Sequence, residues 1–145
     1  MKRNLLRHGL LLFLLGLVTG LLIPQLHNPR MGVSAHLEGL LNGIFLAVLG
    51  LAWEELRLGE RARKVGYALV LFGAYTNWSA TLLAAIFGTS KLTPIAGAGF
   101  VGPAAAEAVV SVLLVALSLA MIAALILFIK GLRAEPERVA GTLQG

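Results

Sequence analysis

The sequence predicts an all-α integral membrane protein, built as an antiparallel bundle of four transmembrane helices. Of its 145 residues, 58% are hydrophobic and only 13% are charged, and the mean hydropathy is +0.87. An average soluble domain has about a quarter charged residues. A helix needs about 20 apolar residues to cross the hydrocarbon core of a bilayer. Four stretches meet this length: residues 5–26, 33–56, 65–88 and 104–129.

The first stretch, residues 5–26, follows two basic residues in the way that a secretory signal does. Its apolar run is longer than that of a typical signal, and no small-residue cleavage site follows at residues 23–25. We therefore expect it to be retained as a helix. Pro24 and the pair Asn28-Pro29 should end this helix, because proline lacks an N–H and biases its predecessor away from helix.

The second stretch should form an antiparallel pair with the first, because the turn between them is short. It is expected to begin near Gly32 or to be capped by Ser34. A second short turn, around residues 59–63, leads to the third stretch. Residues 1–133 would form one membrane domain, and residues 134–145 would form a disordered cytoplasmic tail.

The loop before the fourth stretch, TSKLTPIAGAGFVGP, is long and rich in glycine and proline. Non-helical backbone at membrane depth is tolerated only where protein or water satisfies its polar groups. The loop is therefore either a lid over a site on the non-cytoplasmic side or a plain surface connection. The sequence leaves both interpretations open.

Basic residues predict the orientation of the bundle. Ten of the twelve lysines and arginines fall at the end that holds both termini, whereas Arg30 and Lys91 fall at the other end. Lysine and arginine favour the cytoplasmic side of a membrane, so both termini are expected to be cytoplasmic. Basic residues that flank membrane helices account for the net charge of +5. We therefore expect no nucleic-acid partner.

Several kinds of site are excluded by composition. The chain has no cysteine, which rules out disulfides, thiolate metal sites and iron–sulfur clusters. No phosphate-binding loop, GxSxG or HExxH motif is present. With only three histidines in the chain, a metal site built from several histidines is not expected.

Polar side chains nevertheless recur on the predicted membrane helices at helical spacing. At about 100° per residue, His36 shares a face with Gly39 and Gly43. On an adjoining face of the same helix, Glu38 and Asn42 are i,i+4 neighbours. This predicted helix thus turns small and polar residues away from lipid.

The depth of these residues predicts a polar cleft. Asn42 and Asn77 each lie about 15 Å, at 1.5 Å per residue, from the outer ends of their helices, which is near the midplane. A shallower layer on the same side would contain His36, Glu38, Thr81 and Glu107. We expect the cleft to descend from the non-cytoplasmic face to the two asparagines.

Each of these residues also has a plainer explanation. His36 could rest at the membrane interface, and Glu38 and Glu107 could share a proton for structural reasons alone. Asn42 and Asn77 could simply join helix to helix. Ionisable residues at this depth are functional by default, however, and the shared depth of the whole set favours a site.

A histidine on a glycine-lined face is also compatible with a haem site. His36 would supply an axial ligand, and Gly39 and Gly43 would let a flat macrocycle approach the helix closely.

Three segments carry a resemblance to the hydroxylaminobenzene mutase family: NPRMGVSAHLEGLLNG, GAYTNWSATLLAAIFG and KLTPIAGAG. The resemblance extends over residues 10–121. The family is in turn similar to styrene oxide isomerase, a four-helix membrane enzyme in which Ala-His and Asn-Gly have the spacing of Ala35-His36 and Asn42-Gly43. That isomerase is a trimer that holds haem b between protomers.

The resemblance implies an isomerase of the bacterial inner membrane that converts hydroxylaminobenzene to 2-aminophenol during nitroaromatic degradation. His36 would be the axial ligand of a ferric haem b that acts as a Lewis acid. Asn42 would face the reacting oxygen and Asn77 would help to orient the substrate, while Glu38 or Glu107 would relay a proton. A small aromatic substrate, the lipid bilayer and a homotrimeric assembly are the expected partners.

One position departs from the isomerase. Its functional tyrosine falls at the position of Thr81, and Tyr75 lies on a different helical face. This difference favours the mutase reaction over epoxide isomerisation. An epoxide isomerase, a non-enzymatic haem or electron-transfer protein and a small transporter are the alternatives.

Overall fold

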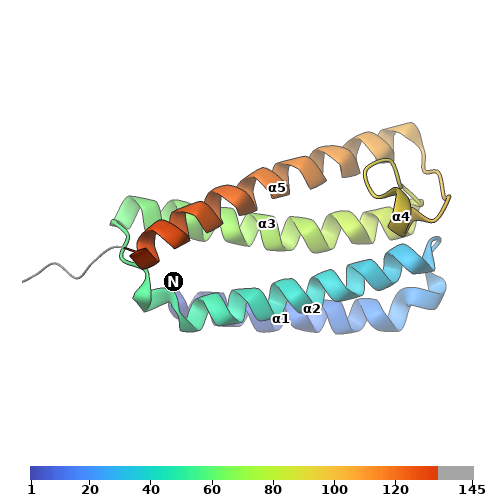
Figure 1. Ribbon diagram of the computed structural model, residues 1–145. Helices are drawn as coiled ribbons and strands as arrows, with labels where there is room; N and C mark the ends of the chain where they lie inside the picture. Colours follow the sequence, from blue (N-terminus) through green and yellow to red (C-terminus); the bar gives the residue numbers. More distant parts are fainter. Residues whose placement is uncertain (134–145) are drawn as a thin grey trace, which may run out of the picture.

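The computed structural model describes residues 1–133, and the predicted tail at residues 134–145 lies outside this part. Its elements, in chain order, are α1 (Lys2–Leu22), η1 (Ile23–Gln25), α2 (Pro29–Leu51), η2 (Trp53–Glu55), α3 (Glu60–Phe87), α4 (Pro94–Gly97) and α5 (Ala104–Arg133). The four long helices lie side by side, and consecutive long helices are antiparallel (Figure 1). All four are long and apolar enough to cross a membrane, which confirms the predicted fold class.

Helix α2 begins earlier than the sequence predicted. The side chain of Asn28 accepts a hydrogen bond from the N–H of Met31 at 3.1 Å, and Pro29 occupies the first helical position. Asparagine is a strong N-cap, and proline is well suited to the first turn. The expected start at Gly32 or Ser34 was therefore wrong, because Asn28-Pro29 starts α2 in addition to following α1.

Helices α3 and α5 extend beyond their apolar stretches. α3 begins at Glu60 instead of residue 65, and α5 continues to Arg133 instead of residue 129. Glu60 in a first turn and Arg133 in a last turn both complement the helix dipole, so these charged segments remain helical. At its other end α3 stops at Gly88, whose φ of 69° is readily available to glycine.

Helices α1 and α2 pack at glycines. A Cβ atom added to Gly43 would lie 2.7 Å from the backbone N of Phe13, and one added to Gly9 would lie 2.7 Å from the backbone O of Gly43. A Cβ atom on Gly39 would overlap the Cα of Gly16. Backbones this close gain van der Waals contact along the whole crossing, as is common between membrane helices.

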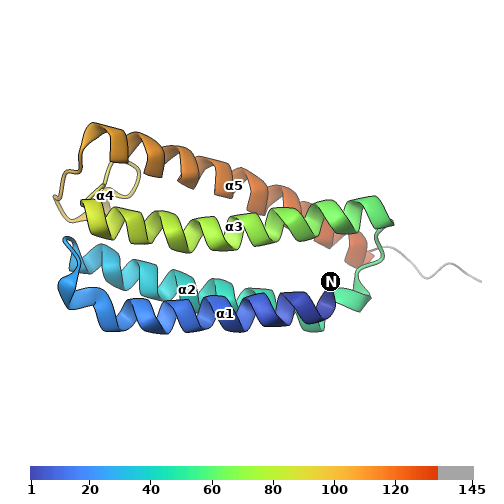
Figure 2. The same cartoon turned by 180° about the vertical axis from the view of Figure 1, so that it is seen from behind.

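The bundle consists of two helix pairs. α1 packs along α2, α5 packs along α3, and the pairs meet mainly where α2 contacts α3 (Figures 1 and 2). A larger buried cluster lies toward the termini and includes Leu5, Leu46, Trp53 and Phe128. A smaller one lies toward the other end and consists of Met31, Ala84, Ala85 and Val110. The polar residues at 38, 42, 77 and 81 fall between these two clusters along the chain.

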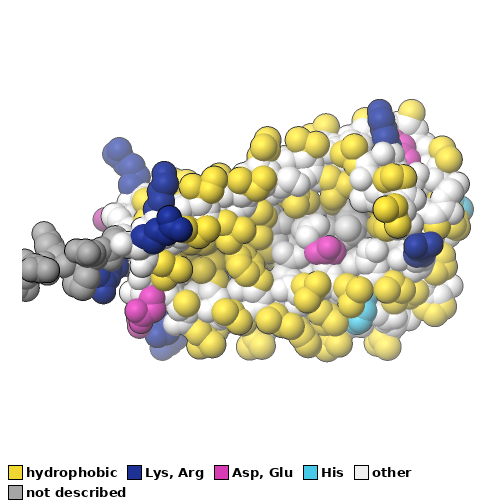
Figure 3. All heavy atoms as spheres, viewed as in Figure 1, with side chains coloured by type: hydrophobic (Ala, Val, Ile, Leu, Met, Phe, Trp, Pro, Cys, Tyr) yellow, Lys and Arg dark blue, Asp and Glu magenta, His cyan; other side chains and the backbone are white. Residues whose placement is uncertain are grey.

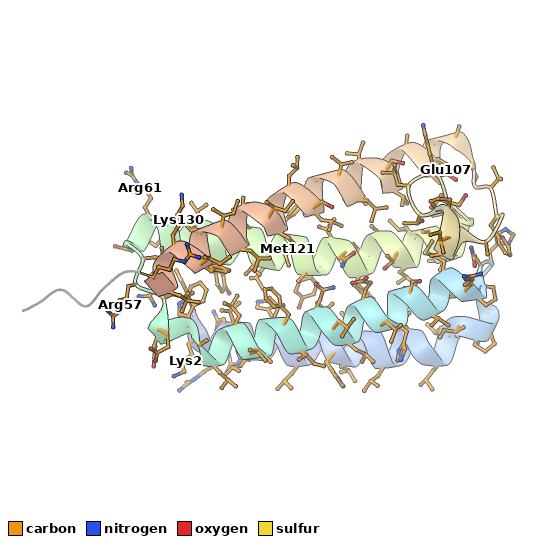
Figure 4. All side chains as sticks on the ribbon, viewed as in Figure 1. Lys2, Arg57, Arg61, Glu107, Met121 and Lys130 are labelled. Carbon is orange, nitrogen blue, oxygen red and sulfur yellow. The ribbon has the colours of Figure 1, made fainter. Side chains whose placement is uncertain are left out.

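The surface is apolar along the bundle and charged at its ends. Hydrophobic side chains cover much of the face in Figure 3 around a central recess that holds an acidic side chain, and lysine and arginine gather mostly at one end. Figure 4 shows Lys2, Arg57, Arg61 and Lys130 together at that end and Glu107 at the opposite one. The described chain therefore has the charge distribution of an integral membrane protein.

Candidate functional site

Glu38, Asn42 and Asn77 form a hydrogen-bonded group where α2 meets α3, which we call the polar triad. The Oε2 atom of Glu38 accepts from Nδ2 of Asn42 at 3.0 Å and from Nδ2 of Asn77 at 2.5 Å. Asn42 also donates to the backbone O of Glu38 at 2.9 Å, one helical turn before it. The structure thus brings together three of the predicted site residues, from two helices.

The polar triad lies near the middle of the bundle's length. Because α2 runs from Pro29 to Leu51, Glu38 and Asn42 flank its middle. Glu38 was expected in a shallower layer than Asn42, and it does lie one turn nearer the Pro29 end of α2. Asn42 is buried, and Glu38 and Asn77 are half-buried. Figure 3 shows an acidic side chain in a recess midway along the face between α2 and the α3–α5 pair.

Thr81 lies one turn beyond Asn77 on α3 and is directed toward its own helix. Its hydroxyl lies 2.8 Å from the backbone O of Asn77 and 2.9 Å from that of Trp78. The single hydroxyl proton is therefore used within α3, as is common for threonine in helices. Thr81 is buried beside the polar triad and adds no side-chain hydrogen bond to it.

His36 faces α1 instead of the polar triad. Its Nδ1 atom lies 2.8 Å from the backbone O of Gly16, and a Cβ atom on Gly20 would meet the same ring at 2.7 Å. Since a carbonyl oxygen can only accept, Nδ1 carries the proton, and the Nε2 lone pair remains available. Among residues 1–133, Nε2 has no hydrogen-bond partner.

The imidazole of His36 fits an axial ligand, whereas the glycines do not fit a ring cradle. A metal-bound histidine usually donates its other N–H to a carbonyl or carboxylate, which is what the bond to Gly16 provides. Gly39 and Gly43 do share a face with His36, as predicted, but that face is filled by α1. The expectation that these two glycines leave room for a macrocycle is therefore wrong.

Thr19 and Trp78 tie α1 to α3 beside the polar triad, and the sequence did not single out this pair. Nε1 of Trp78 donates to Oγ1 of Thr19 at 3.1 Å, and Thr19 donates to the backbone O of Leu15 at 2.8 Å. The indole also lies against Gly39. A lone threonine in the apolar run LGLVTG was the available signal.

Glu107 organises the loop between α3 and α5 and is not part of the polar triad. Its carboxylate accepts backbone hydrogen bonds from Ser90 at 2.9 Å, Lys91 at 3.0 Å and Gly102 at 3.4 Å. Within the described chain, no hydrogen bond joins Glu107 to Glu38, so these residues do not share a proton. The contacts of Glu107 are those of a loop anchor.

A second anchor holds the same loop from the other side. Nδ2 of Asn28 donates to the backbone O of Gly97 in α4 at 3.0 Å, and the backbone N of Asn28 donates to Ala85 at 2.9 Å. Asn28 is fully buried. Together with Glu107, it fixes the loop across the end of the bundle opposite the termini, so the loop is more than a plain surface connection.

Comparisons with known proteins identify relatives of the chain. The family model for styrene oxide isomerase matches residues 1–133. Hydroxylaminobenzene mutase HabB of Ectopseudomonas oleovorans is 48% identical over 139 residues, which cover 95% of this chain and 85% of that protein. Hydroxylaminobenzene mutase HabA of the same organism is 44% identical over 133 residues, which cover 91% of this chain and 98% of that protein. No solved structure matches the chain significantly.

Proposed function

Because the chain belongs to the styrene oxide isomerase family and is homologous to hydroxylaminobenzene mutases, which are isomerases, we propose that it converts hydroxylaminobenzene to 2-aminophenol. The observation that carries this proposal is the polar triad, in which one carboxyl group holds two asparagines in the middle of a membrane domain. An ionisable group at that depth is costly, and such groups are usually retained because they have a function.

The reaction moves a hydroxyl group from nitrogen to the ortho carbon of the ring. Substrate and product are isomers, so no reductant or oxidant is consumed. One proton leaves the ring carbon and one joins the nitrogen. Glu38 would take up the first and return it to the nitrogen, while Asn42 and Asn77 would orient the hydroxyl and the nitrogen. An apolar aryl substrate would reach this depth through the bilayer.

Haem b forms part of the proposal through His36. The Nε2 atom of His36 would bind the iron, and the bond from Nδ1 to Gly16 would hold the ring orientation. A bound ferric haem would supply a Lewis acid for the substrate oxygen. His36 and the polar triad lie on different faces of α2, so a haem on His36 would serve the polar triad of a neighbouring protomer. The resemblance to a trimer that holds haem between protomers supports such a homotrimer.

We also propose an orientation in the bacterial inner membrane. The end that carries Lys2, Arg57, Arg61 and Lys130 would face the cytoplasm, in accordance with the preference of basic residues for that side. The loop anchored by Glu107 would then face the periplasm.

Turnover of labelled substrate tests the proposed reaction. Purified protein in mild detergent would be given hydroxylaminobenzene with oxygen-18 in the hydroxyl group, and the product analysed by mass spectrometry. The proposal expects 2-aminophenol that retains the label. Unlabelled 2-aminophenol would point to attack by water, and no product at all would overturn the proposal. Glu60→Gln, on the exposed first turn of α3, is a matched control that keeps full activity.

Epoxide isomerisation is the second candidate, because the matching family model is that of styrene oxide isomerase. Thr81 argues against it, since its hydroxyl is directed into α3 and cannot replace the tyrosine expected at this position. Assays of styrene oxide and hydroxylaminobenzene on one preparation separate the two reactions.

A further inference from the structure

Resting on the proposed function, we propose that the polar triad selects its substrate by hydrogen-bond polarity. It binds aryl compounds that donate N–H or O–H hydrogens and discriminates against aryl compounds that can only accept, such as nitroso compounds and epoxides. Glu38 is the residue that sets this polarity, because it holds both asparagine amides in one orientation.

The orientation of the two amides follows from their shared contact. Oε2 of Glu38 lies 3.0 Å from Asn42 and 2.5 Å from Asn77, and both contacts need an N–H on the asparagine. An ionised Glu38 can only accept, which fixes this orientation, and a neutral Glu38 keeps it when the carboxyl proton sits on Oε1. Both NH2 groups therefore face Glu38.

The atoms that remain for a ligand are mostly acceptors. Asn42 uses both amide hydrogens on Glu38, one on the carboxyl group and one on the backbone O. Asn77 uses one of its two. The Oδ1 atoms of both asparagines and Oε1 of Glu38 accept no hydrogen bond from residues 1–133, and none of the three is sealed from the surface.

An arylhydroxylamine matches this set of atoms. Its N–H and O–H groups are two donors on adjacent atoms, which can pair with the outward oxygens of Asn42 and Asn77. Nitrosobenzene has the same heavy atoms without either hydrogen, and styrene oxide has no donor at all. Either ligand would cover the asparagine oxygens and leave them unpaired, and sites that hydrogen-bond a substrate group reject analogues lacking it strongly.

Thr81 strengthens the same polarity. A hydroxyl aimed into the site could donate to an epoxide or nitroso oxygen, but the proton of Thr81 goes to the backbone of α3. The neighbouring indole N–H of Trp78 is likewise used on Thr19. Two nearby donors that could have formed hydrogen bonds to an acceptor-only ligand are thus already paired within the protein.

Binding of ligands other than hydroxylaminobenzene tests the inference without turnover of that substrate. Aniline and phenol carry donors, nitrosobenzene and styrene oxide carry none, and each Kd would be measured by calorimetry on the wild-type protein in detergent. We expect aniline and phenol to bind about 10- to 100-fold more tightly. The acceptor-only pair is the more apolar, so partitioning into detergent works against this result. Aniline and phenol that bind no more tightly than nitrosobenzene overturn the proposal.

Two variants test whether Glu38 causes the discrimination. Glu38→Gln introduces an amide that can itself donate, so Asn42 and Asn77 can rotate, and the preference should fall below about threefold. Asn77→Ala, which leaves Glu38 and Asn42 in place, should lower it in part if the first variant fails to fold. Glu60→Gln should keep the full preference. Undiminished discrimination in folded Glu38→Gln would exclude the amide orientation as its cause.

Hydroxylaminobenzene turnover on the same wild-type preparation separates this inference from the proposed function. Donor-selective binding without turnover would retain the inference and reject the mutase reaction. Turnover together with unselective binding would support the mutase reaction and reject the inference.

Discussion

Asn77 on α3 donates to the same carboxyl oxygen of Glu38 on α2 that Asn42 already contacts from one turn away. The contact joins the two helix pairs of the bundle near the middle of α2. A single carboxyl oxygen therefore connects the helix pairs and orients two candidate substrate-binding amides.

Glu38 and Asn77 should be coupled in catalysis. Glu38→Gln and Asn77→Ala are each expected to lower kcat/KM at least about tenfold. The double variant should lose little more than the worse single variant, because partners in one network typically show interaction energies of about 0.5–3 kcal/mol. The check is a double-mutant cycle on hydroxylaminobenzene turnover, and losses that multiply would show independent roles.

Gly39 should be required for the α1–α2 packing. Gly39→Ala places a Cβ atom on the Cα of Gly16, and overpacking of this kind costs about 1–3 kcal/mol. Gly59→Ala is the matched control, because a Cβ atom there meets nothing within 4 Å and the φ of −59° suits alanine. Thermal unfolding in detergent should show a lower midpoint for Gly39→Ala alone. Equal midpoints for the two variants would refute the packing role.

Asn28 should matter far more than Ser34. Asn28→Ala removes the cap of α2 and the bond to Gly97, and loss of a cap alone costs about 1 kcal/mol. Ser34, which the sequence offered as an alternative cap, makes no capping bond, so Ser34→Ala should leave the unfolding midpoint within error. The measurement is thermal unfolding of both variants, and a larger effect of Ser34→Ala would contradict the structure.

Glu107 should protect the loop from protease. Lys91 is the only lysine or arginine within residues 88–103, so trypsin can cut the loop only there. Glu107→Gln weakens charge-assisted bonds to three backbone N–H groups, so the loop should open more often and be cut faster. Fragment masses over a digestion time course measure the effect, with Glu54→Gln as the control. Unchanged cleavage would mean that Glu107 does not hold the loop.

We expect His36 to be the iron ligand of any bound haem. Wild-type protein purified from haem-replete cells should show a Soret band, and His36→Ala should lack it, because its Nε2 atom would be the iron ligand. His27→Ala is the control, since that histidine is exposed and lies against Phe100 and the end of α3. A band of equal height in His36→Ala would exclude this ligand. An active wild-type protein with no band would remove haem from the proposed reaction.

The sequence predicted what depends on hydropathy and helical spacing. The four apolar stretches, the shared face of His36, Gly39 and Gly43, and the i,i+4 pair of Glu38 and Asn42 all appear in the structure. The helix ends were less predictable, because apolar length locates the membrane part of a helix and not its charged extensions. Asn28-Pro29 can either stop or start a helix, and only the contact with Met31 decides between the two.

The neighbours of the site residues could not be predicted in the same way. Helical spacing shows that His36 and Gly39 share a face, but not that α1 fills it. The contacts of Glu107 depend on the backbone path of an irregular loop, which has no periodicity to read. The contact between Asn77 and Glu38 depends on how α3 is rotated against α2, which is decided by packing along both helices.

The spacing of Glu38 and Asn42 also bears on how the chain enters the membrane. Asn77 follows Glu38 by 39 residues, so it leaves the ribosome after the first two helices. Asn42 lies one turn away on the same helix, and its amide reaches Glu38 as soon as α2 is helical. The acidic side chain is thus inserted with a hydrogen-bond partner of its own, and the later arrival of α3 completes a contact that α2 has already begun.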